Sequence, residues 1–563
     1  MGVWLVRGVL NLLRYDTVAI AGDYGPPSVE KPLGLLPVVR DFLARLDVVG
    51  IVDRLCPVRE DARITHGQVV AALVAHRLTA PGAIVHVEDW ARAWAVEEMF
   101  VLPPDALNDD RIGRALEAVA DRCDEIVGSI GAAAIAVFGL EMARVHWDLT
   151  SISVHGVYPD ADDDHPTPRH GHPKDGRTDL KQIQTGQGVT ADGGVPVFWK
   201  VYDGGAAEVS QVEAAMRAIR GLAAERRFLL VGDSKLVSYS NLSAIDAAGV
   251  CFLAPASKTL IPNTVLAGLD WASARILDHV PARDAGKFAH QRASHRAREG
   301  VTVLRGPRAV DPPLSVRTVY IWSSEHQKAA RAAREKKIDT AREDLVRLRR
   351  NLGKYGYTSE AAVTDRVEAI RRRHGVTAWL RTQVGTDDDT GTPTLLWHFD
   401  ERTLAIDTAA DGWFALLTNQ TTGEADTGEV FAEYKGQDVV ERRHRAFKGP
   451  LAVAPIFLEN NARICGLLHT VCIALLVFAL VERQARQATG PDGKVPGLYA
   501  GRARPPHRPT HRQSPRRPAP RARPQRPTRL HPPPQPAPAA AARYPRRRPH
   551  PTTMIATRST ETP

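Results

Sequence analysis

The sequence predicts a mixed α/β fold in which a sheet of short strands follows a helical amino-terminal region. Three observations support this prediction. Helical patterns run through residues 35–140. After them, five β-rich runs lie near residues 144–152, 181–190, 195–203, 227–232 and 251–255. A long insertion then separates Asp233 from the helical segment around Glu441.

The helical region has recognisable helix starts. Thr65 is followed three residues later by Gln68 and then by an apolar run, which is the pattern of a capping box. Such a region can bind DNA, pair two protomers or simply pack against the sheet. The sequence contains no evident recognition helix, so these alternatives stay open.

The first strand carries an aspartate at its centre. Val145, Trp147 and Leu149 fall on one side of this strand, and Asp148 falls on the other. This alternation predicts a strand with one buried face, with Asp148 pointing away from it. The structural alternative is an aspartate of a turn or cap.

A second carboxylate follows another predicted strand. The buried run from Phe228 ends at Gly232-Asp233, and a helix is predicted over residues 236–247. Open α/β sheets present their ligand sites at the carboxyl ends of strands, which is where Asp233 lies. Aspartate is also common in turns and at helix starts, so a structural role is the alternative.

A third acidic residue lies in the segment Tyr434 to Lys448. If this segment is one helix, Tyr434, Gln437, Glu441 and Lys448 share a stripe about 60° wide, because each residue turns the helix by about 100°. One face then carries a phenol, an amide, a carboxylate and a cation. That combination suits contact with a phosphate backbone and a metal ion.

The same segment also has a plainer interpretation. Arg442, Arg443 and Arg445 lie beside Glu441, and such a basic run suits any solvent-exposed helix. Short motifs match by chance, so the segment alone does not decide between the two interpretations.

The spacing Tyr434-x2-Gln437-x3-Glu441-x6-Lys448 resembles the Tyr-x2-Arg-x3-Glu-x6-Lys signature of DDE transposases from bacterial insertion sequences. Gln437 stands where that signature has arginine, so it can hydrogen-bond a phosphate but cannot neutralise it. The stretches 171–182, 190–204 and 411–419 are also similar to the strands of that family. The resemblance covers roughly residues 35–500, and its motifs occur in the family's order.

The resemblance implies an RNase H-like catalytic core that cleaves the ends of an insertion sequence and transfers them into target DNA. It implies that Asp148, Asp233 and Glu441 hold two Mg²⁺ ions, for which Mn²⁺ can substitute. It further implies a homodimer in a synaptic complex and a location at the bacterial nucleoid in the cytoplasm. The residues that it places against DNA are Tyr434, Gln437, Arg445 and Lys448.

Three further function classes remain open on the sequence alone. The first is an inactive DNA-binding remnant or repressor, and the second is an RNase H-like nuclease that cuts DNA without joining it. The third is a membrane-associated protein, which only the apolar residues 464–481 support. The carboxylate trio speaks against the first, and only a joining assay separates the second from a transposase.

The predicted domain layout follows from these assignments. It comprises an extension (1–34), a helical domain (35–140), the first part of the core (141–258), an inserted α+β domain (259–405), the second part of the core (406–490) and a basic tail (491–563). Within the insertion, two helices are expected over residues 325–352 and 359–374, with apolar seams that pack together.

Charge is distributed unevenly along the 563 residues. The formal net charge is +10, but residues 501–563 contain 15 arginines, 17 prolines and one acidic residue, which gives +14 in the tail. Residues 1–500 therefore carry −4, and DNA affinity in the folded part has to come from local patches. A tail of this composition is expected to be disordered, and its abrupt start suggests either a reading-frame change or a polycationic arm.

Two features bear on compartment. The five cysteines are scattered without Cys-x-x-Cys or zinc-ligand spacing, so they are expected to be buried thiols in a reducing compartment. Residues 464–481 are almost continuously apolar, which is near the length of a membrane span. Because this run contains His469 and follows the glutamate helix, a buried core helix is expected there.

Overall fold

The computed structural model describes residues 30–158, 164–171, 176–224, 226–280, 284 and 286–489, together with the backbone of 495–499 and 502–504. The predicted extension therefore lies outside the described residues up to residue 29. The predicted tail also lies outside them, apart from the short strands β12 (Val495–Tyr499) and β13 (Arg502–Arg504).

Helices form the amino-terminal region, as the sequence predicts. Thr65 closes the predicted capping box, since its hydroxyl accepts from the Gln68 N–H at 3.1 Å and the Gln68 side chain accepts from the Thr65 N–H at 2.8 Å. The helices are α2 (Leu36–Arg45), α3 (Val48–Leu55), α4 (His66–Thr79), α5 (Val87–Ala93), α6 (Val96–Phe100), α7 (Asp109–Asp121) and α8 (Cys123–Phe138), with 3-10 turns at Ile84–His86 and Pro104–Ala106.

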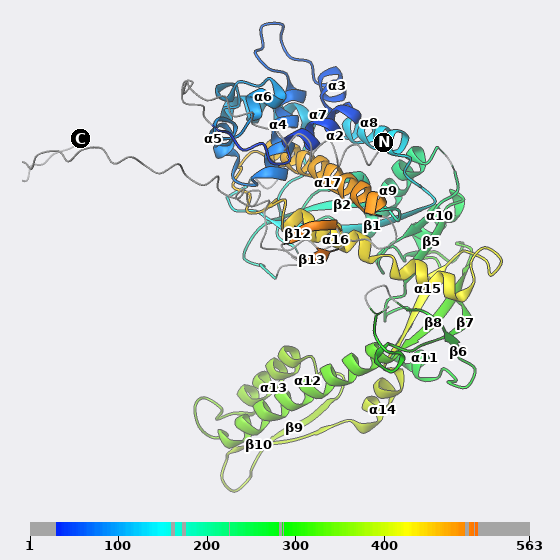
Figure 1. The fold of residues 1–563 in the computed structure, drawn as a ribbon. Coiled ribbons are helices and arrows are strands. Elements are labelled where there is room, and N and C mark those ends of the chain that lie inside the picture. The colour runs from blue at the N-terminus through cyan, green and yellow to red at the C-terminus, as the bar shows by residue number, and fades with distance from the viewer. Residues whose placement is uncertain are drawn as a thin grey trace, which may run out of the picture. The chain divides into compact units, whose positions relative to one another are not determined.

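A nine-stranded mixed sheet follows, in the order β3-β2-β1-β4-β5-β11-β8-β7-β6 (Figure 1). Its strands are β1 (Arg144–Ser153), β2 (Gln182–Thr190), β3 (Pro196–Tyr202), β4 (Leu229–Val231), β5 (Cys251–Pro255), β6 (Arg275–Leu277), β7 (His295–Leu304), β8 (Leu314–Ser323) and β11 (Trp413–Thr418). The first five begin and end within two residues of the predicted runs. β1, β2 and β3 are antiparallel neighbours, whereas β4 runs parallel to β1 and to β5. This arrangement is consistent with an RNase H-like core.

The prediction that β1 buries only one face is wrong. His146 and Trp147, which point to opposite faces, are 0% and 3% exposed. Helices α16 (Asp438–Lys448) and α17 (Asn461–Thr489) contact the sheet on the side of His146. On the other side, Ile219 of α9 (Glu208–Leu222) lies against Gly188 of β2. β1 is therefore a central strand covered on both faces.

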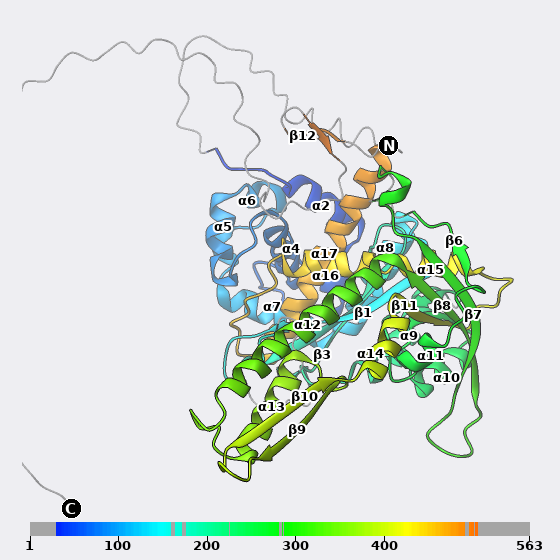
Figure 2. The ribbon, with the colours of Figure 1, turned by 90° about the horizontal axis from the view of Figure 1, so that it is seen from below.

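The residues expected to form one inserted domain are divided in the structure. β6, β7 and β8 extend the main sheet beyond β11, so they continue the core rather than leave it. A separate hydrophobic cluster joins α12 (Ser324–Arg350) and α13 (Glu360–His374) to the hairpin of β9 (Leu380–Thr386) and β10 (Pro393–Phe399) (Figure 2). The predicted apolar seams form this cluster. Two further helices of this stretch are α11 (Asn263–Ala267) and α14 (Glu401–Ala410).

The apolar segment 464–481 lies inside α17. Among the described residues, α17 is long and apolar enough to cross a membrane. The only other candidate there is α4 taken together with the following turn and α5, and these segments are bent by 97° relative to each other. In this structure α17 is buried and packs against α4, α7 and β3 (Figure 1). It is a core helix, as predicted.

Candidate active site

The register of the two central parallel strands places Asp148 and Asp233 side by side. His146 of β1 is paired with Val231 of β4. Asp148 lies two residues further along β1, and Asp233 lies two residues beyond Val231, just past the end of β4. Neighbouring strands lie about 4.8 Å apart, so the two carboxylates come close together where β4 ends beside the middle of β1. Both also line one small surface hollow.

Backbone amides hold each carboxylate. The Asp148 Oδ1 atom accepts from the Leu149 N–H at 2.9 Å, and the Asp233 Oδ1 atom accepts from the Lys235 N–H at 2.9 Å. The second contact is the turn geometry that the structural alternative for Asp233 anticipated. A turn role and a ligand role are compatible, because a carboxylate has two oxygens with several lone pairs.

Helix α16 brings the third predicted carboxylate to the same region. Its His444 is 9% exposed, and the His444 Nδ1 atom lies 3.4 Å from the Asp148 Oδ2 atom. Glu441 lies three residues earlier on this helix, hence one turn away, and is exposed. His444 was not singled out from the sequence, although its spacing from Glu441 could have indicated it.

Tyr434 provides an independent link between the carboxylates. Burial raises the pKa of the Tyr434 phenol, and the charges of Glu441 and Asp233 raise it further. Tyr434 thus lies within electrostatic reach of both. Its ring also packs 6.0 Å from the ring of Phe414, so part of this side chain belongs to the core.

The helix expected over residues 434–448 is interrupted. α15 (Thr427–Lys435) ends before Gly436, and α16 starts at Asp438. Tight turns bridge them, since the Gln437 N–H bonds to the Tyr434 carbonyl at 3.0 Å and the Val440 N–H to the Gln437 carbonyl at 3.2 Å. The assumption of one straight helix with a single stripe is therefore wrong.

The basic side chains of α16 have different roles. Arg443 is 4% exposed; it donates to the carbonyls of Gly193 and Gly194 at 2.7 and 2.6 Å and pairs with Glu482 of α17 at 2.6 Å. Arg443 therefore fastens α16 to the turn between β2 and β3. The interpretation of this segment as a uniformly solvated basic helix is wrong.

The four predicted DNA contacts are spread over this region. Gln437 occupies the turn between the two helices and is half-buried, as is Lys448 at the end of α16. Arg445 is exposed, and its Nη2 atom lies 3.4 Å from the Asp438 Oδ1 atom. The structure thus brings Tyr434 near the carboxylates and leaves Arg445 on the solvent side of α16.

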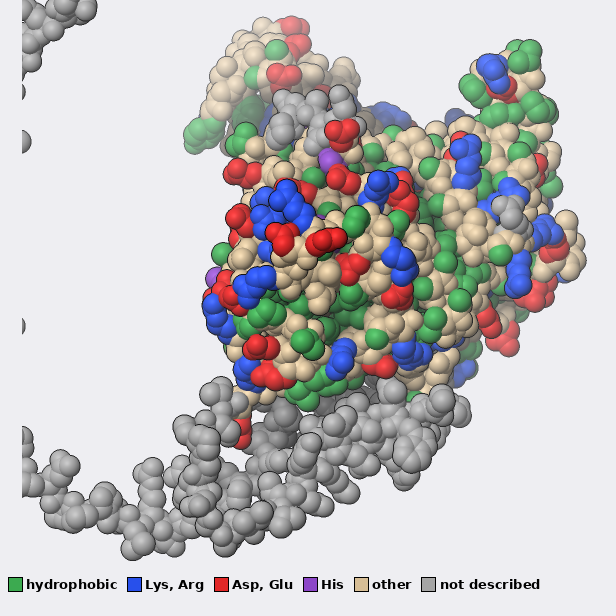
Figure 3. Space-filling model, turned by 90° about the horizontal axis from the view of Figure 1, so that it is seen from above, with side chains coloured by type: hydrophobic (Ala, Val, Ile, Leu, Met, Phe, Trp, Pro, Cys, Tyr) green, Lys and Arg blue, Asp and Glu red, His purple; other side chains and the backbone are tan. Residues whose placement is uncertain are grey.

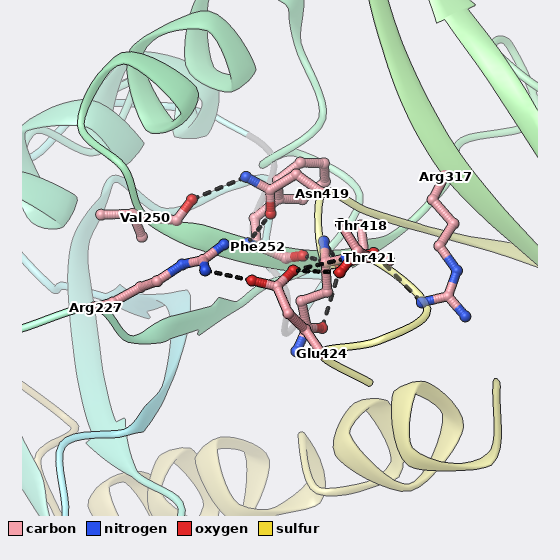
Figure 4. Close-up of polar contacts among 9 residues, drawn as sticks. Arg227, Val250, Phe252, Arg317, Thr418, Asn419, Thr421 and Glu424 are labelled. Carbon is pink, nitrogen blue, oxygen red and sulfur yellow. Dashed lines mark hydrogen bonds and ion pairs between the residues drawn. The ribbon is translucent and has the colours of Figure 1, made fainter. Parts of the chain in front are cut away.

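A network of polar contacts fixes the loop that leads into these helices (Figure 4). Asn419, just after β11, accepts from the Phe252 N–H at 2.8 Å and donates to the Val250 carbonyl at 2.9 Å. Glu424 then accepts from the Thr421 N–H at 2.8 Å. The bonds of Asn419 tie the start of the loop to β5 and the residue before it, and the bond of Glu424 closes a turn within the loop.

His146 is buried directly beneath the turn between α15 and α16. A Cβ atom at Gly436 would lie 3.3 Å from the His146 Cε1 atom, so glycine allows the turn to approach the strand. Neither ring nitrogen of His146 has a hydrogen-bond partner among the described residues. Burial, and to a lesser extent the charge of Arg144, lowers the pKa of His146 to about 3.

This histidine predicts an acid-sensitive fold. The folded state keeps the ring neutral, whereas the unfolded chain protonates it near its ordinary pKa. Its contribution to stability is therefore present above about pH 6.5 and is lost as the pH falls towards 3. The unfolding free energy of the wild type should fall between pH 7 and pH 5. We expect this fall to be smaller by ~2 kcal/mol in His146→Phe, as measured by urea denaturation at the two pH values. The exposed His290→Phe is the control, and an equal effect of both variants would contradict the assignment.

The donor set fits divalent metal ions with hard ligands. Asp148 and Asp233 line one hollow, and Glu441 lies one helical turn from His444, which contacts Asp148. Carboxylate oxygens are the ligands that Mg²⁺ and Mn²⁺ prefer in proteins. Asp148, Asp233 and Glu441 are the residues that could hold such ions.

The surface seen in Figure 3 carries acidic and basic side chains interspersed, with no broad basic area on that face. This agrees with the small net negative charge of residues 1–500. Electrostatic attraction to DNA on this face is consequently local.

Comparisons with known proteins give limited similarities. Residues 29–127 match the model of a family described as a domain of unknown function, DUF4277. No curated protein matches the chain. Among solved structures, the chain is similar to a piggyBac transposase in a synaptic complex with hairpin DNA, with a TM-score of 0.32 and 8% identity over 81% of this chain and 75% of that one. At this score the likeness adds nothing to the description of the site.

Proposed function

We propose that this protein is a DDE-type transposase that cleaves the ends of its own insertion sequence and joins them to target DNA. The observation that carries the proposal is that Asp148 of β1 and Asp233, just past the end of the neighbouring β4, line one hollow. The contact of His444 with Asp148 brings the helix of Glu441 to the same region. A core that is consistent with the RNase H-like arrangement supports it as well.

In this proposal Asp148, Asp233 and Glu441 hold two Mg²⁺ ions. Bound there, the ions supply Lewis-acid activation of the attacking oxygen and stabilisation of the leaving oxygen. His444 positions the Asp148 carboxylate through the contact at 3.4 Å. In the same proposal Tyr434 and Gln437 contact the DNA backbone near the reacting phosphate, and Lys448 and Arg445 contact it further along α16.

The partners are those that the resemblance to insertion-sequence transposases implies. The substrates are the inverted-repeat ends of the element and a target DNA, and two protomers pair in the synaptic complex. A reaction on chromosomal DNA of a bacterium places the protein in the cytoplasm at the nucleoid. The helical region 36–138 is available for end recognition or for protomer pairing.

The test is a joining assay with DNA that carries the repeats flanking the gene. Purified protein with Mg²⁺ is expected to release the ends and to produce end–target junctions that sequencing detects. Cleavage without any junction would identify a nuclease. Binding without cleavage would identify an inactive remnant, and either result would reject the transposase assignment.

Gln437→Arg is expected to strengthen DNA contact. The substitution adds a forked cation at the turn before α16, where it can pair with a phosphate, so the affinity for end DNA should rise about 3- to 10-fold at low salt. The measurement is a binding titration at two salt concentrations, since an added phosphate contact makes the salt dependence steeper. Gln437→Leu is the matched control. Unchanged affinity and salt dependence in the Arg variant would place Gln437 away from DNA.

A further inference from the structure

Two cysteines and a histidine that are far apart in the sequence meet beside the sheet. Cys123 begins α8, whereas Cys465 and His469 lie one turn apart on α17. One sulfur from each cysteine and a ring nitrogen of the histidine all lie within 4.8 Å of one another. Of this pair, Cys465 is buried as expected, whereas Cys123 is only partly buried.

Trp199 of β3 determines the proton position on His469. The Trp199 Nε1 atom lies 3.1 Å from the His469 Nδ1 atom, and an indole nitrogen can only donate. Nδ1 is thus the acceptor, and the neutral ring carries its proton on Nε2. A metal-bound histidine usually donates its second N–H to an oxygen, which is the opposite polarity. The ring is arranged to donate a proton rather than to bind a metal.

The His469 Nε2 atom is buried and has no hydrogen-bond partner among the described residues, so a thiolate beside it would gain a donor. Hydrogen bonding between the two thiols lowers the pKa of Cys123 against the opposing effect of burial, and the same contact together with burial raises the pKa of Cys465. The first turn of α8 adds its unpaired N–H groups, which favour an anion.

The two thiols differ in access. Cys123 is partly exposed, while Cys465 is 2% exposed. The partial exposure of Cys123 at the start of α8 leaves its sulfur accessible to a small reagent. An accessible thiolate next to a buried thiol is the arrangement in which the first is oxidised and the second resolves it.

We propose that Cys123 and Cys465 form an oxidation-sensitive thiol pair that closes to a disulfide when the protein meets a peroxide. The Cys123 thiolate attacks one peroxide oxygen, which gives a sulfenic acid and releases hydroxide. The Cys465 sulfur then attacks the Cys123 sulfur and expels hydroxide, which takes up the thiol proton as water. The net change is two thiols oxidised and one peroxide reduced to two waters.

The bond would link segments 342 residues apart in the chain. Cys123 lies within the helical region that matches DUF4277, and Cys465 lies on the helix that this region packs against. Oxidation would therefore clamp the helical region to the core. This modification is independent of the proposed transposase activity.

The test exposes the folded full-length protein to hydrogen peroxide and measures intact mass and free thiols. The wild type is expected to lose about 2 Da and two of its five thiols. Peptide mapping should recover a Cys123–Cys465 disulfide. Cys465→Ser should retain fast alkylation of Cys123 by iodoacetamide at pH 6 but form no disulfide. Cys123→Ser should lose both reactions, whereas the control Cys251→Ser should retain both.

Other outcomes would overturn the proposal. Four or more thiols remaining after peroxide, or a disulfide that does not join Cys123 to Cys465, would do so. A zinc titration tests the competing chemistry, in which the same three groups bind metal. Stoichiometric zinc that requires Cys123, Cys465 and His469 and blocks alkylation would identify a metal site instead.

Discussion

Asp148→Asn and Asp233→Asn are each expected to lower Mg²⁺-dependent DNA cleavage by at least about 100-fold. Losing a residue that only supports a metal ligand costs up to about 100-fold, and losing the ligand itself should cost at least as much. The amide keeps the size of the carboxylate but removes its charge and one of its anionic oxygens. The two positions are neighbours across β1 and β4, so either change dismantles the same centre. Their double variant should be no worse than the more damaging single one, because residues that act as a unit are non-additive.

Glu441→Gln should have the same effect, and α16 provides a matched control for it. Asp438 lies one turn earlier on that helix, is exposed and pairs with Arg442 at 3.3 Å. Asp438→Asn should keep cleavage within about threefold of the wild type, because exposed pairs contribute little. All variants should still bind DNA in a gel-shift assay. Full cleavage by Glu441→Gln would remove this residue from the site.

Gly466→Ala is expected to destabilise the fold more than other small substitutions in α17. A Cβ atom at Gly466 would lie 2.0 Å from the Leu116 carbonyl oxygen and 2.8 Å from the Leu116 Cα atom of α7. The obstacle is backbone, so the two helices have to separate. We expect a loss of unfolding free energy of about 3 kcal/mol, the upper end for overpacking, in spite of the better helix propensity of alanine.

Gly128 is the matched control for this substitution. It lies within α8, and a Cβ atom there would meet nothing within 4 Å. Gly128→Ala should stabilise by up to about 1 kcal/mol, because alanine favours the helix. Urea denaturation of both variants gives the comparison. Equal stability of Gly466→Ala and the wild type would show that α7 and α17 are not in close contact.

Local sequence signals predicted much of the fold. The five strands of the first part of the core and the helix start at Thr65 depend on patterns within a few residues, and the structure contains them. The carboxyl-terminal position of Asp233 after its strand also follows from local pattern. Its pairing with Asp148 could be expected only through a resemblance to known folds.

What the sequence could not predict depends on distant segments. Helices α16 and α17, more than 280 residues later, cover the face of β1 that carries polar residues. The alternation of apolar and polar residues in β1 therefore wrongly indicated that this face is exposed. At the break between α15 and α16, Gly436 packs over His146, a contact that no helical pattern reveals. Arg443 appeared to belong on a solvent-exposed face, yet its partners Gly193 and Glu482 lie in other elements.

Binding of Mn²⁺ measured by electron paramagnetic resonance tests the central proposal most directly, since it needs neither DNA nor turnover. Free Mn²⁺ gives the signal, so its loss on titration counts the ions bound. The wild type and Asp438→Asn are expected to bind two ions per chain, because two-metal sites are built from such carboxylate groups. Asp148→Asn, Asp233→Asn and Glu441→Gln should each lose at least one of them. Equal binding by the wild type and all three variants would contradict a metal centre at these residues.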